Sequence, residues 1–187
     1  FTFSPTHPLD DFYAHAGLKL PRIEVIPPHV VPATYQHLLV HDGDMTPTLE
    51  KFYESAIHLE VLRSERQGDF YFREVVLRTD DVDERVEFGA IKIFLNLFPA
   101  AARADILAER LPLGSILAKY RIEHTSRPKC FLGIESDELM NRALGLNGNP
   151  VVLYGRRNTL STPEGHPLAE IVEILPPAKK ATTNGLE

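Results

Sequence analysis

The sequence contains a single cysteine and no long hydrophobic run. Because Cys130 has no second cysteine to pair with, the chain can form neither an internal disulfide nor a cysteine-based metal cluster, and nothing indicates an oxidising compartment. No apolar run approaches the roughly 20 residues that a membrane-spanning helix requires. The N-terminus also lacks the basic and then apolar pattern of a signal peptide. We expect a soluble, cytoplasmic protein with no membrane partner.

Positive charge is also scarce. The chain carries 20 Lys and Arg residues against 26 Asp and Glu residues, which gives a net charge of -6. Nucleic-acid binding needs clustered basic residues, so nucleic acid is not an expected partner. The 187 residues, 43% of them hydrophobic, are enough for one domain with a sizeable core. We expect a monomer or a small homo-oligomer.

Common catalytic signatures are missing as well. The sequence has no Gly-rich phosphate loop, no nucleophile elbow and no His-Glu-x-x-His zinc motif. His37 and His41 have the i,i+4 spacing that can hold a metal on a helix, but the turn predicted at Asp42 and Gly43 disrupts that spacing. We therefore predict no metal site and no cofactor.

Proline interrupts the first 34 residues, and strand-like segments dominate the rest. Six prolines between positions 1 and 34 favour an extended arm with one short helical piece near Asp10 to Ala16. Thr46 and Pro47 predict a helix start, with Thr46 as the cap and Pro47 at the first helical position. Segments rich in β-branched and aromatic residues predict strands at Ile57 to Arg66, Phe70 to Arg78, Val86 to Asn96, Ile122 to Ser136, Pro150 to Ser161 and Pro167 to Leu175.

Three further segments have helical composition. They are Ala100 to Leu111, Ser115 to Lys119, and Asp137 to Leu144, which Gly145 closes. Short links between long strands imply antiparallel hairpins. The predicted fold class is therefore α+β, an antiparallel sheet with helices packed against it. We expect the arm at 1–34, the domain at 35–178 and a flexible tail at 179–187.

Arg73 is the first candidate site residue. In its predicted strand, alternation places Arg73 on the same face as Tyr71, Val75 and Leu77, a mainly apolar row. Burying a guanidinium without a partner costs several kcal/mol, so Arg73 must meet a carboxylate of the protein or of a ligand. The alternative is an arginine on an edge strand that faces solvent or pairs within the protein.

Two acids in the last predicted strand are the next candidates. Glu170 and Glu173 both have apolar neighbours on their own face, so alternation alone does not decide which of them points inward. A carboxyl group in an apolar pocket can exchange protons near neutral pH. The alternative is that one acid faces solvent while the other pairs with Arg156 or Arg157 in the neighbouring strand.

Five short motifs follow one another between positions 38 and 177. They are Leu38-Leu39-Val40-His41-Asp42-Gly43-Asp44-Met45-Thr46, Phe72-Arg73-Glu74-Val75-Val76-Leu77, Pro112-Leu113-Gly114, Tyr154-Gly155-Arg156-Arg157 and Glu173-Ile174-Leu175-Pro176-Pro177. Their order and spacing resemble the bacterial chorismate pyruvate-lyase family, in its more divergent branch. One residue more than in better-known members lies between Pro167 and Glu173, which leaves Glu170 as a rival. The spacing of Glu173 to Pro177 favours Glu173.

The resemblance implies both a fold and a site. The fold would be a six-stranded antiparallel sheet with helices on one side, and two flap-like helical segments would seal the ligand from solvent. Arg73 would bind the ring carboxylate of chorismate with its planar fork. Main-chain groups of Met45 and Leu113 would hold the ligand from the flaps, and Glu173 would contact the ring hydroxyl.

The implied reaction splits chorismate into 4-hydroxybenzoate and pyruvate without a cofactor. The ring loses its enolpyruvyl group and its C4 proton, and aromatisation drives the step. Glu173 would assist the proton transfer while Arg73 anchors the ring. Arg156 or Arg157 would neutralise the side-chain carboxylate, and only one of them can point into the site because consecutive strand residues face opposite ways.

Two other functions are consistent with the same motifs. One is a non-catalytic small-molecule sensor, because the effector-binding domains of some bacterial transcription regulators resemble this fold. The other is a lyase-like enzyme that acts on a related enolpyruvyl or cyclohexadiene carboxylate. A sensor would normally carry an N-terminal helix-turn-helix, which the Pro-rich arm cannot supply. The expected partner in every case is a small molecule, with chorismate as the substrate of the lyase.

Overall fold

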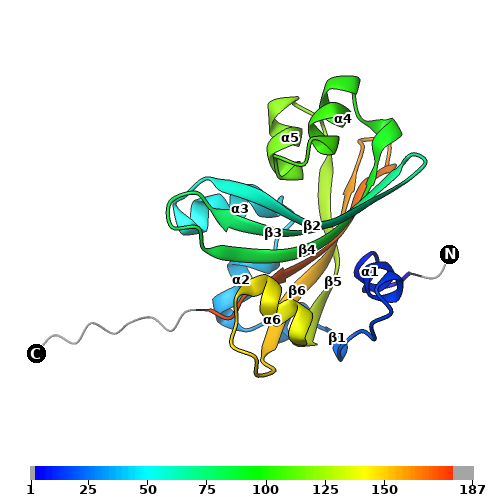
Figure 1. Cartoon of the computed structure of the whole chain (residues 1–187). Coiled ribbons are helices and arrows are strands. Elements are labelled where there is room, and N and C mark those ends of the chain that lie inside the picture. Colours follow the sequence, from blue (N-terminus) through cyan, green and yellow to red (C-terminus); the bar gives the residue numbers. More distant parts are fainter. Residues whose placement is uncertain (1–2, 179–187) are drawn as a thin grey trace, which may run out of the picture.

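Seven antiparallel strands form a single sheet in the computed structural model, which describes residues 3–178 (Figure 1). Their order across the sheet is β1-β5-β6-β7-β4-β3-β2. Long hairpins join β2 to β3, β3 to β4 and β6 to β7. The strands are β1 (Ile23–Ile26), β2 (Ile57–Gln67), β3 (Phe70–Thr79), β4 (Arg85–Phe94), β5 (Thr125–Glu135), β6 (Val152–Ser161) and β7 (Pro167–Leu175).

The α+β class and the antiparallel sheet are confirmed, but the prediction of six strands is wrong. The additional strand is β1, whose residues pair with β5 from Ile23 opposite Ile134 to Ile26 opposite Phe131. Prolines before and after β1 keep it short and confine it to the sheet edge, where a missing backbone N–H is tolerated. The proline-rich segment is therefore part of the sheet as well as an arm.

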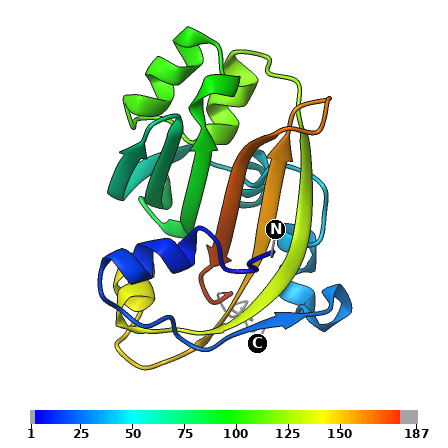
Figure 2. The same ribbon diagram turned by 90° about the vertical axis from the view of Figure 1, so that its right-hand side faces the viewer.

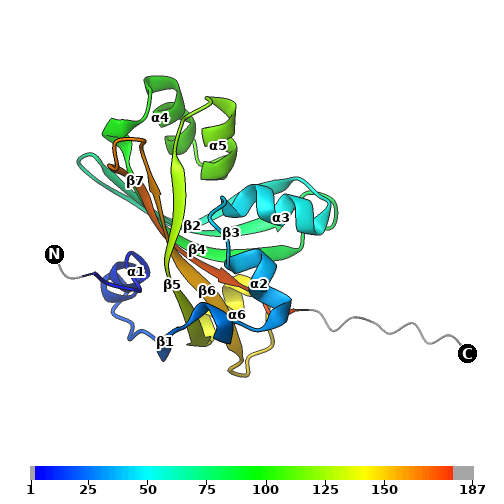
Figure 3. The ribbon, with the colours of Figure 1, turned by 180° about the vertical axis from the view of Figure 1, so that it is seen from behind.

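Helices cover both faces of the sheet, so the prediction of helices on one side is also wrong. Figure 2 views the face that α1 covers, and Figure 3 views the face that α2 and α3 cover. The central strands carry apolar side chains on both faces, and both faces must therefore be shielded from water. The helices are α1 (Leu9–His15), α2 (Ala33–Leu39), α3 (Met45–Tyr53), α4 (Ala100–Leu107), α5 (Leu113–Lys119) and α6 (Glu138–Leu144), with short 3-10 turns at Pro28–Val30 and Leu95–Leu97.

Three apolar clusters hold these layers together. The first joins α1 and α6 to one sheet face through side chains such as Phe12, Phe88 and Met140. The other two lie on the opposite face, one beneath α4 and α5 and one beneath α2 and α3. The junction of these two clusters is where the candidate site lies. No helix within residues 3–178 is long and apolar enough to cross a membrane.

The helix termini correct several predictions. Helix α3 begins at Met45, and Asp44 rather than Thr46 occupies the N-cap position. Pro47 is thus the third helical residue, which is tolerated because the first four N–H groups of a helix have no partner within it. Helix α4 ends at Leu107 instead of Leu111, and Glu109 beyond it has a left-handed φ of 56°. In α6, Asp137 accepts a hydrogen bond from the backbone of Met140, and Gly145 closes the helix with a φ of 65° as predicted.

Helix α2 was not predicted, because it has only seven residues and follows a proline-rich segment. Pro32 precedes it, and Tyr35, Leu38 and Leu39 are buried on one side of it. Tertiary packing of this apolar stripe, rather than intrinsic propensity, stabilises the helix. The flexible tail predicted at 179–187 lies outside the described residues.

Candidate active site in a closed cavity

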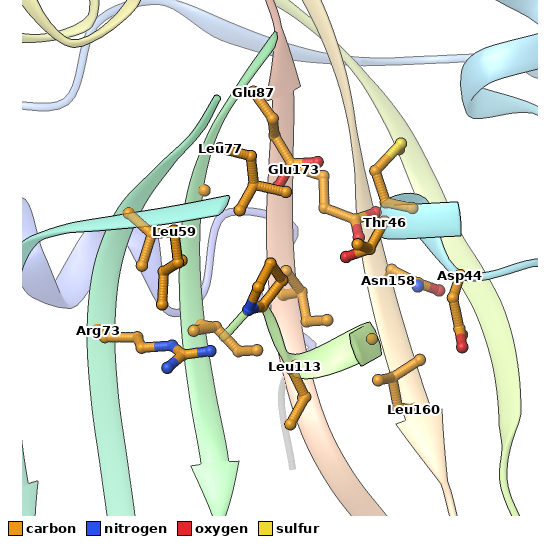
Figure 4. A pocket seen from close by; sticks show the side chains of 17 residues that line it. Asp44, Thr46, Leu59, Arg73, Leu77, Glu87, Leu113, Asn158, Leu160 and Glu173 are labelled. Carbon is orange, nitrogen blue, oxygen red and sulfur yellow. The ribbon is translucent and has the colours of Figure 1, made fainter. Parts of the chain in front are cut away.

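A cavity lies against the sheet face between the first turns of α3 and α5 (Figure 4). Its floor is formed by residues of β2, β3, β4, β6 and β7. Its roof is formed by Met45 and Thr46 at the start of α3 and by Pro112, Leu113 and Gly114 at the start of α5. These are the two segments that the resemblance implied as flaps.

The two flaps are in direct contact above the cavity. A Cβ atom added to Gly114 would lie 2.9 Å from both the Cβ and the Oγ1 of Thr46. Real Cβ atoms do not approach other atoms this closely, so the two helix starts can only meet because residue 114 lacks a side chain. The structure therefore describes the closed arrangement of the flaps.

Arg73 enters the cavity from β3 and is almost fully buried, with 1% of its surface exposed. Its Nη2 donates to the carbonyl oxygen of Leu111 at 3.3 Å. Its Nε and Nη1 have no hydrogen-bond partner within residues 3–178. Such donors are costly to bury, and the carboxylate of a ligand can supply the acceptors that they lack.

The charge of Arg73 persists at neutral pH despite its burial. Burial lowers the pKa of its guanidinium to about 10, while the nearby Tyr71 and Glu109 oppose this change. Tyr71 donates its hydroxyl hydrogen to Glu109, so that carboxylate already has a partner. The cavity therefore contains a cation that an anionic ligand can neutralise.

Glu173 reaches the cavity from β7, on the far side from Arg73 in Figure 4. It is buried, and its Oε2 accepts a hydrogen bond from the Nε of Arg156 at 2.5 Å. Arg156 lies opposite Glu173 on the neighbouring strand β6. The sequence offered an acid in the ligand pocket or an acid paired with an arginine as alternatives. Glu173 is both, because it faces the cavity and is paired with Arg156.

Arg156 bonds both to Glu173 and to the segment that leads into α3. Besides pairing with Glu173, its Nη1 donates to the carbonyls of Leu39 at 3.4 Å and His41 at 3.0 Å, and its Nη2 donates to that of Gly43 at 2.9 Å. These three carbonyls belong to the segment that leads into α3. Arg156 therefore connects the site acid to the base of one flap.

The prediction that Arg156 or Arg157 neutralises a second ligand carboxylate does not fit this geometry. Neither arginine is among the described residues that line the cavity. The donors of Arg156 are used within the protein, and Arg157 points to the opposite face of the sheet. There Arg157 lies 3.5 Å from Glu170, whose carboxylate also lies 3.6 Å from His7. The structure thus places Glu173 in the cavity and its rival Glu170 outside it.

Glu87 on β4 is a cavity residue that the sequence did not single out. It is 4% exposed, and its Oε2 has no hydrogen-bond partner in the described part of the chain. Burial, reinforced by the charge of Glu173, raises the pKa of this carboxyl well above its usual range. The available signal was its position in the apolar run Val86 to Phe94, two residues before Gly89 and therefore on the same face.

A set of polar contacts fixes the segment before α3. Nε2 of His124 donates to Asp44 Oδ2 at 2.7 Å, and its Nδ1 lies 2.8 Å from the carbonyl of Ile122. Both ring nitrogens face acceptors, which favours the doubly protonated ring, and the hydrogen bond to Asp44 raises the pKa of His124. Ser126 also donates to the carbonyl of Gly43 at 3.1 Å. The contacts of His124 with Asp44 and of Ser126 with Gly43 join residues about 80 positions apart, so no local pattern predicts them.

The chain was compared with known proteins. No protein-family model matches it, and no curated protein matches its sequence. Solved structures do match. PhnF from Mycobacterium smegmatis has a TM-score of 0.53 and 12% identity, with 73% of this chain and 64% of that one covered. The gene product SA0254 from Staphylococcus aureus has a TM-score of 0.51 and 12% identity, with 66% and 90% covered.

A third match is the possible transcriptional regulator YydK from Bacillus subtilis, with a TM-score of 0.50, 9% identity, and 64% of this chain and 58% of that one covered. The chain spans less than two thirds of the length of YydK and of PhnF. At these identities the similarity concerns the fold alone. The protein has a chorismate lyase-like α+β fold that it shares with a possible transcriptional regulator.

Proposed function

We propose that this protein is a chorismate pyruvate-lyase. The observation that carries the proposal is the content of the cavity, where one unpaired cation, Arg73, lies across from two buried acids, Glu87 and Glu173. A site that only binds an anion gains nothing from acids, because their charges oppose the charge of the ligand. Acids beside a reacting ring are useful for moving protons.

The roles follow from the positions of the groups. Arg73 anchors the ring carboxylate with its guanidinium, two of whose nitrogen atoms have no hydrogen-bond partner within residues 3–178. The main chains of Met45 and Leu113 hold the ring from the two flaps. Glu173 accepts the proton from ring C4, and closed apolar walls such as Val75 and Ile171 exclude water while charge develops.

A non-catalytic small-molecule sensor is the second candidate. It is favoured by the structural similarity to YydK, a possible transcriptional regulator. A sensor would use Arg73 and the flaps in the same way, since both candidates need a buried carboxylate partner. The two candidates differ in whether bound chorismate is converted.

Incubation with chorismate distinguishes these candidates. A lyase releases 4-hydroxybenzoate, seen by its ultraviolet absorption, and an equal amount of pyruvate, seen with a coupled dehydrogenase. A sample without protein measures spontaneous breakdown of chorismate. The variants Arg73→Ala and Glu170→Gln form a matched pair, because only Arg73 lines the cavity. Arg73→Ala should lower kcat/KM at least 100-fold, equivalent to about 3 kcal/mol, while Glu170→Gln should leave it near the wild-type value.

Calorimetric titration measures ligand binding and so tests whether the protein is a sensor. A sensor would bind chorismate or 4-hydroxybenzoate in an Arg73-dependent manner and release no pyruvate above the spontaneous rate. That result would refute the lyase. Turnover of chorismate by Arg73→Ala at the wild-type rate would leave the lyase activity in place and refute the anchoring role of Arg73.

A further inference from the structure

Glu87 is the buried titratable group to which the proposed lyase roles assign no task. It lines the cavity, and its Oε2 lacks a hydrogen-bond partner among the residues described. A carboxylate buried without a cation or a donor is far more costly than the neutral acid. The protein reduces this cost if Glu87 carries a proton in the closed cavity.

The charged groups around Glu87 make the two cavity acids unequal. Glu173 approaches from β7, where it lies opposite Gly89, two residues from Glu87 on β4. Its partner Arg156 lies on β6, Arg73 enters from β3, and Asp44 precedes α3. The start of α5 contributes no titratable side chain to the described lining. Glu173 therefore has a cation bonded to it, whereas Glu87 has none bonded to it within the described residues, and the charge of Arg156 opposes the raised pKa of Glu87 only in part.

Figure 4 places the carboxyl groups of Glu87 and Glu173 on the same side of the cavity, across from Arg73. Burial and the neighbouring Glu173 charge both raise the pKa of Glu87. Two acids whose surroundings separate their protonation states are the arrangement that acid–base catalysis needs. The protonated member can give a proton while the ionised member takes one.

We infer that Glu87 is the general acid of the reaction and donates a proton to the leaving enolpyruvyl group while Glu173 accepts one from the ring. This inference rests on the proposed lyase function. The donated proton neutralises the charge that develops on the ether oxygen as the C3–O bond breaks.

The step balances in atoms and electrons. Glu173 accepts the proton at ring C4, and the electron pair of that C–H bond becomes the new C3–C4 double bond of the aromatic ring. The C3–O bond breaks, and its electron pair goes to the ether oxygen of the leaving group. Glu87 gives that oxygen its proton, so enolpyruvate leaves and tautomerises to pyruvate. Transfer of one proton from Glu173 to Glu87 restores the starting state.

Glu87→Gln tests the role because it keeps the shape and the neutral charge of the protonated acid but cannot donate a proton. The expected result is a fall in kcat of about 100-fold to 10,000-fold, with affinity for 4-hydroxybenzoate unchanged within a few-fold. Glu170→Gln, on the opposite face, is the matched control. In wild type, kcat should fall as the pH rises through the titration of Glu87, and Glu87→Gln should lack that limb.

Infrared spectroscopy gives a readout that does not depend on turnover. The wild type and Glu170→Gln should show the carbonyl band of a buried protonated carboxylic acid at neutral pH, and Glu87→Gln should lack it. Glu87→Asp keeps a carboxyl group, so it tests the general-acid role even if Glu87→Gln does not fold. It should retain more turnover than Glu87→Gln.

The outcomes separate this inference from the proposed function. Wild type that turns over chorismate while Glu87→Gln does so equally well would overturn the general-acid role and leave the lyase standing. The same conclusion follows if the infrared band survives in Glu87→Gln, or if Glu87→Asp is no more active than Glu87→Gln. Wild type without turnover would overturn both proposals.

Discussion

Replacing Arg73 by methionine should stabilise the ligand-free protein. Arg73 and Arg156 are both fully buried arginines on the same side of the sheet, with 1% and 0% of their surfaces exposed. They differ in their partners, since Arg156 bonds to Glu173 and three carbonyls, whereas two donor atoms of Arg73 lack a partner among residues 3–178. Methionine fills similar space with an apolar, flexible chain.

The magnitude follows from the cost of buried, unsatisfied donors. Each such group costs about 1–3 kcal/mol, and the single bond from Arg73 to the Leu111 carbonyl, at 3.3 Å, compensates for little of this cost. Arg73→Met should therefore raise the free energy of unfolding by about 1–3 kcal/mol. Arg156→Met should lower it by about 3–5 kcal/mol, because it leaves Glu173 buried without its cation.

Urea denaturation followed by circular dichroism measures both changes under the same conditions, and the midpoint should move up for Arg73→Met and down for Arg156→Met. The stabilised variant should also lose binding of 4-hydroxybenzoate, by at least 100-fold or about 3 kcal/mol. If Arg73→Met instead destabilises the protein as much as Arg156→Met does, Arg73 is satisfied within the protein and the site is not prepared for an anion.

Three further changes test the flaps and the acids. Gly114→Val should disturb the closed flaps by about 1–3 kcal/mol, so stopped-flow should detect release of 4-hydroxybenzoate at least about fivefold faster. His124→Gln should lower the free energy of unfolding most below about pH 6.5, the ordinary pKa of histidine. This loss of stability should shrink as the pH rises through the raised pKa of His124 in the folded protein. A loss of stability that does not depend on pH would contradict the ion pair between His124 and Asp44. Glu173→Gln should abolish turnover and lower stability, whereas Glu170→Gln should change turnover little, and the reverse order would refute the assignment of Glu173.

Local patterns predicted most of the fold. The strand at Pro167–Leu175 was predicted with its observed limits, and Gly145 ends α6 as its sequence position indicated. These features depend on short-range chemistry, namely alternation, turn residues and helix capping. The strand β1 and the helix α2 were not predicted because each exists only through a distant partner, β5 for the strand and the sheet face for the helix.

The candidate site was only partly predictable for the same reason. Alternation placed Arg73 on the same face as Val75 and Leu77, and these three residues do line the cavity together. Alternation could not choose between Glu170 and Glu173, or between Arg156 and Arg157, because each choice depends on which face of β6 and β7 the cavity occupies.

The side that carries the cavity is decided by contacts far apart in the sequence. Arg156 donates hydrogen bonds to the carbonyls of Leu39, His41 and Gly43, and these bonds hold the segment before α3 against one face of β6. Glu173 then shares that face because it lies opposite Arg156 in the register of β6 and β7. A single arginine therefore positions both a flap and an acid.

The distinction between a sensor and a lyase on this fold comes down to the balance of charge within the cavity. Arg73 is the one lysine or arginine among the described lining residues, and it suffices to hold one carboxylate. If Glu87 were ionised, it would cancel this attraction and leave a buried charge without a partner, so binding alone would be served better by an apolar residue at that position. A protonated Glu87 does not repel an anion, and it has a proton to give. Glu87 is therefore compatible with tight binding of an anion only when it is protonated, and the protonated carboxyl group is also the form that can donate a proton.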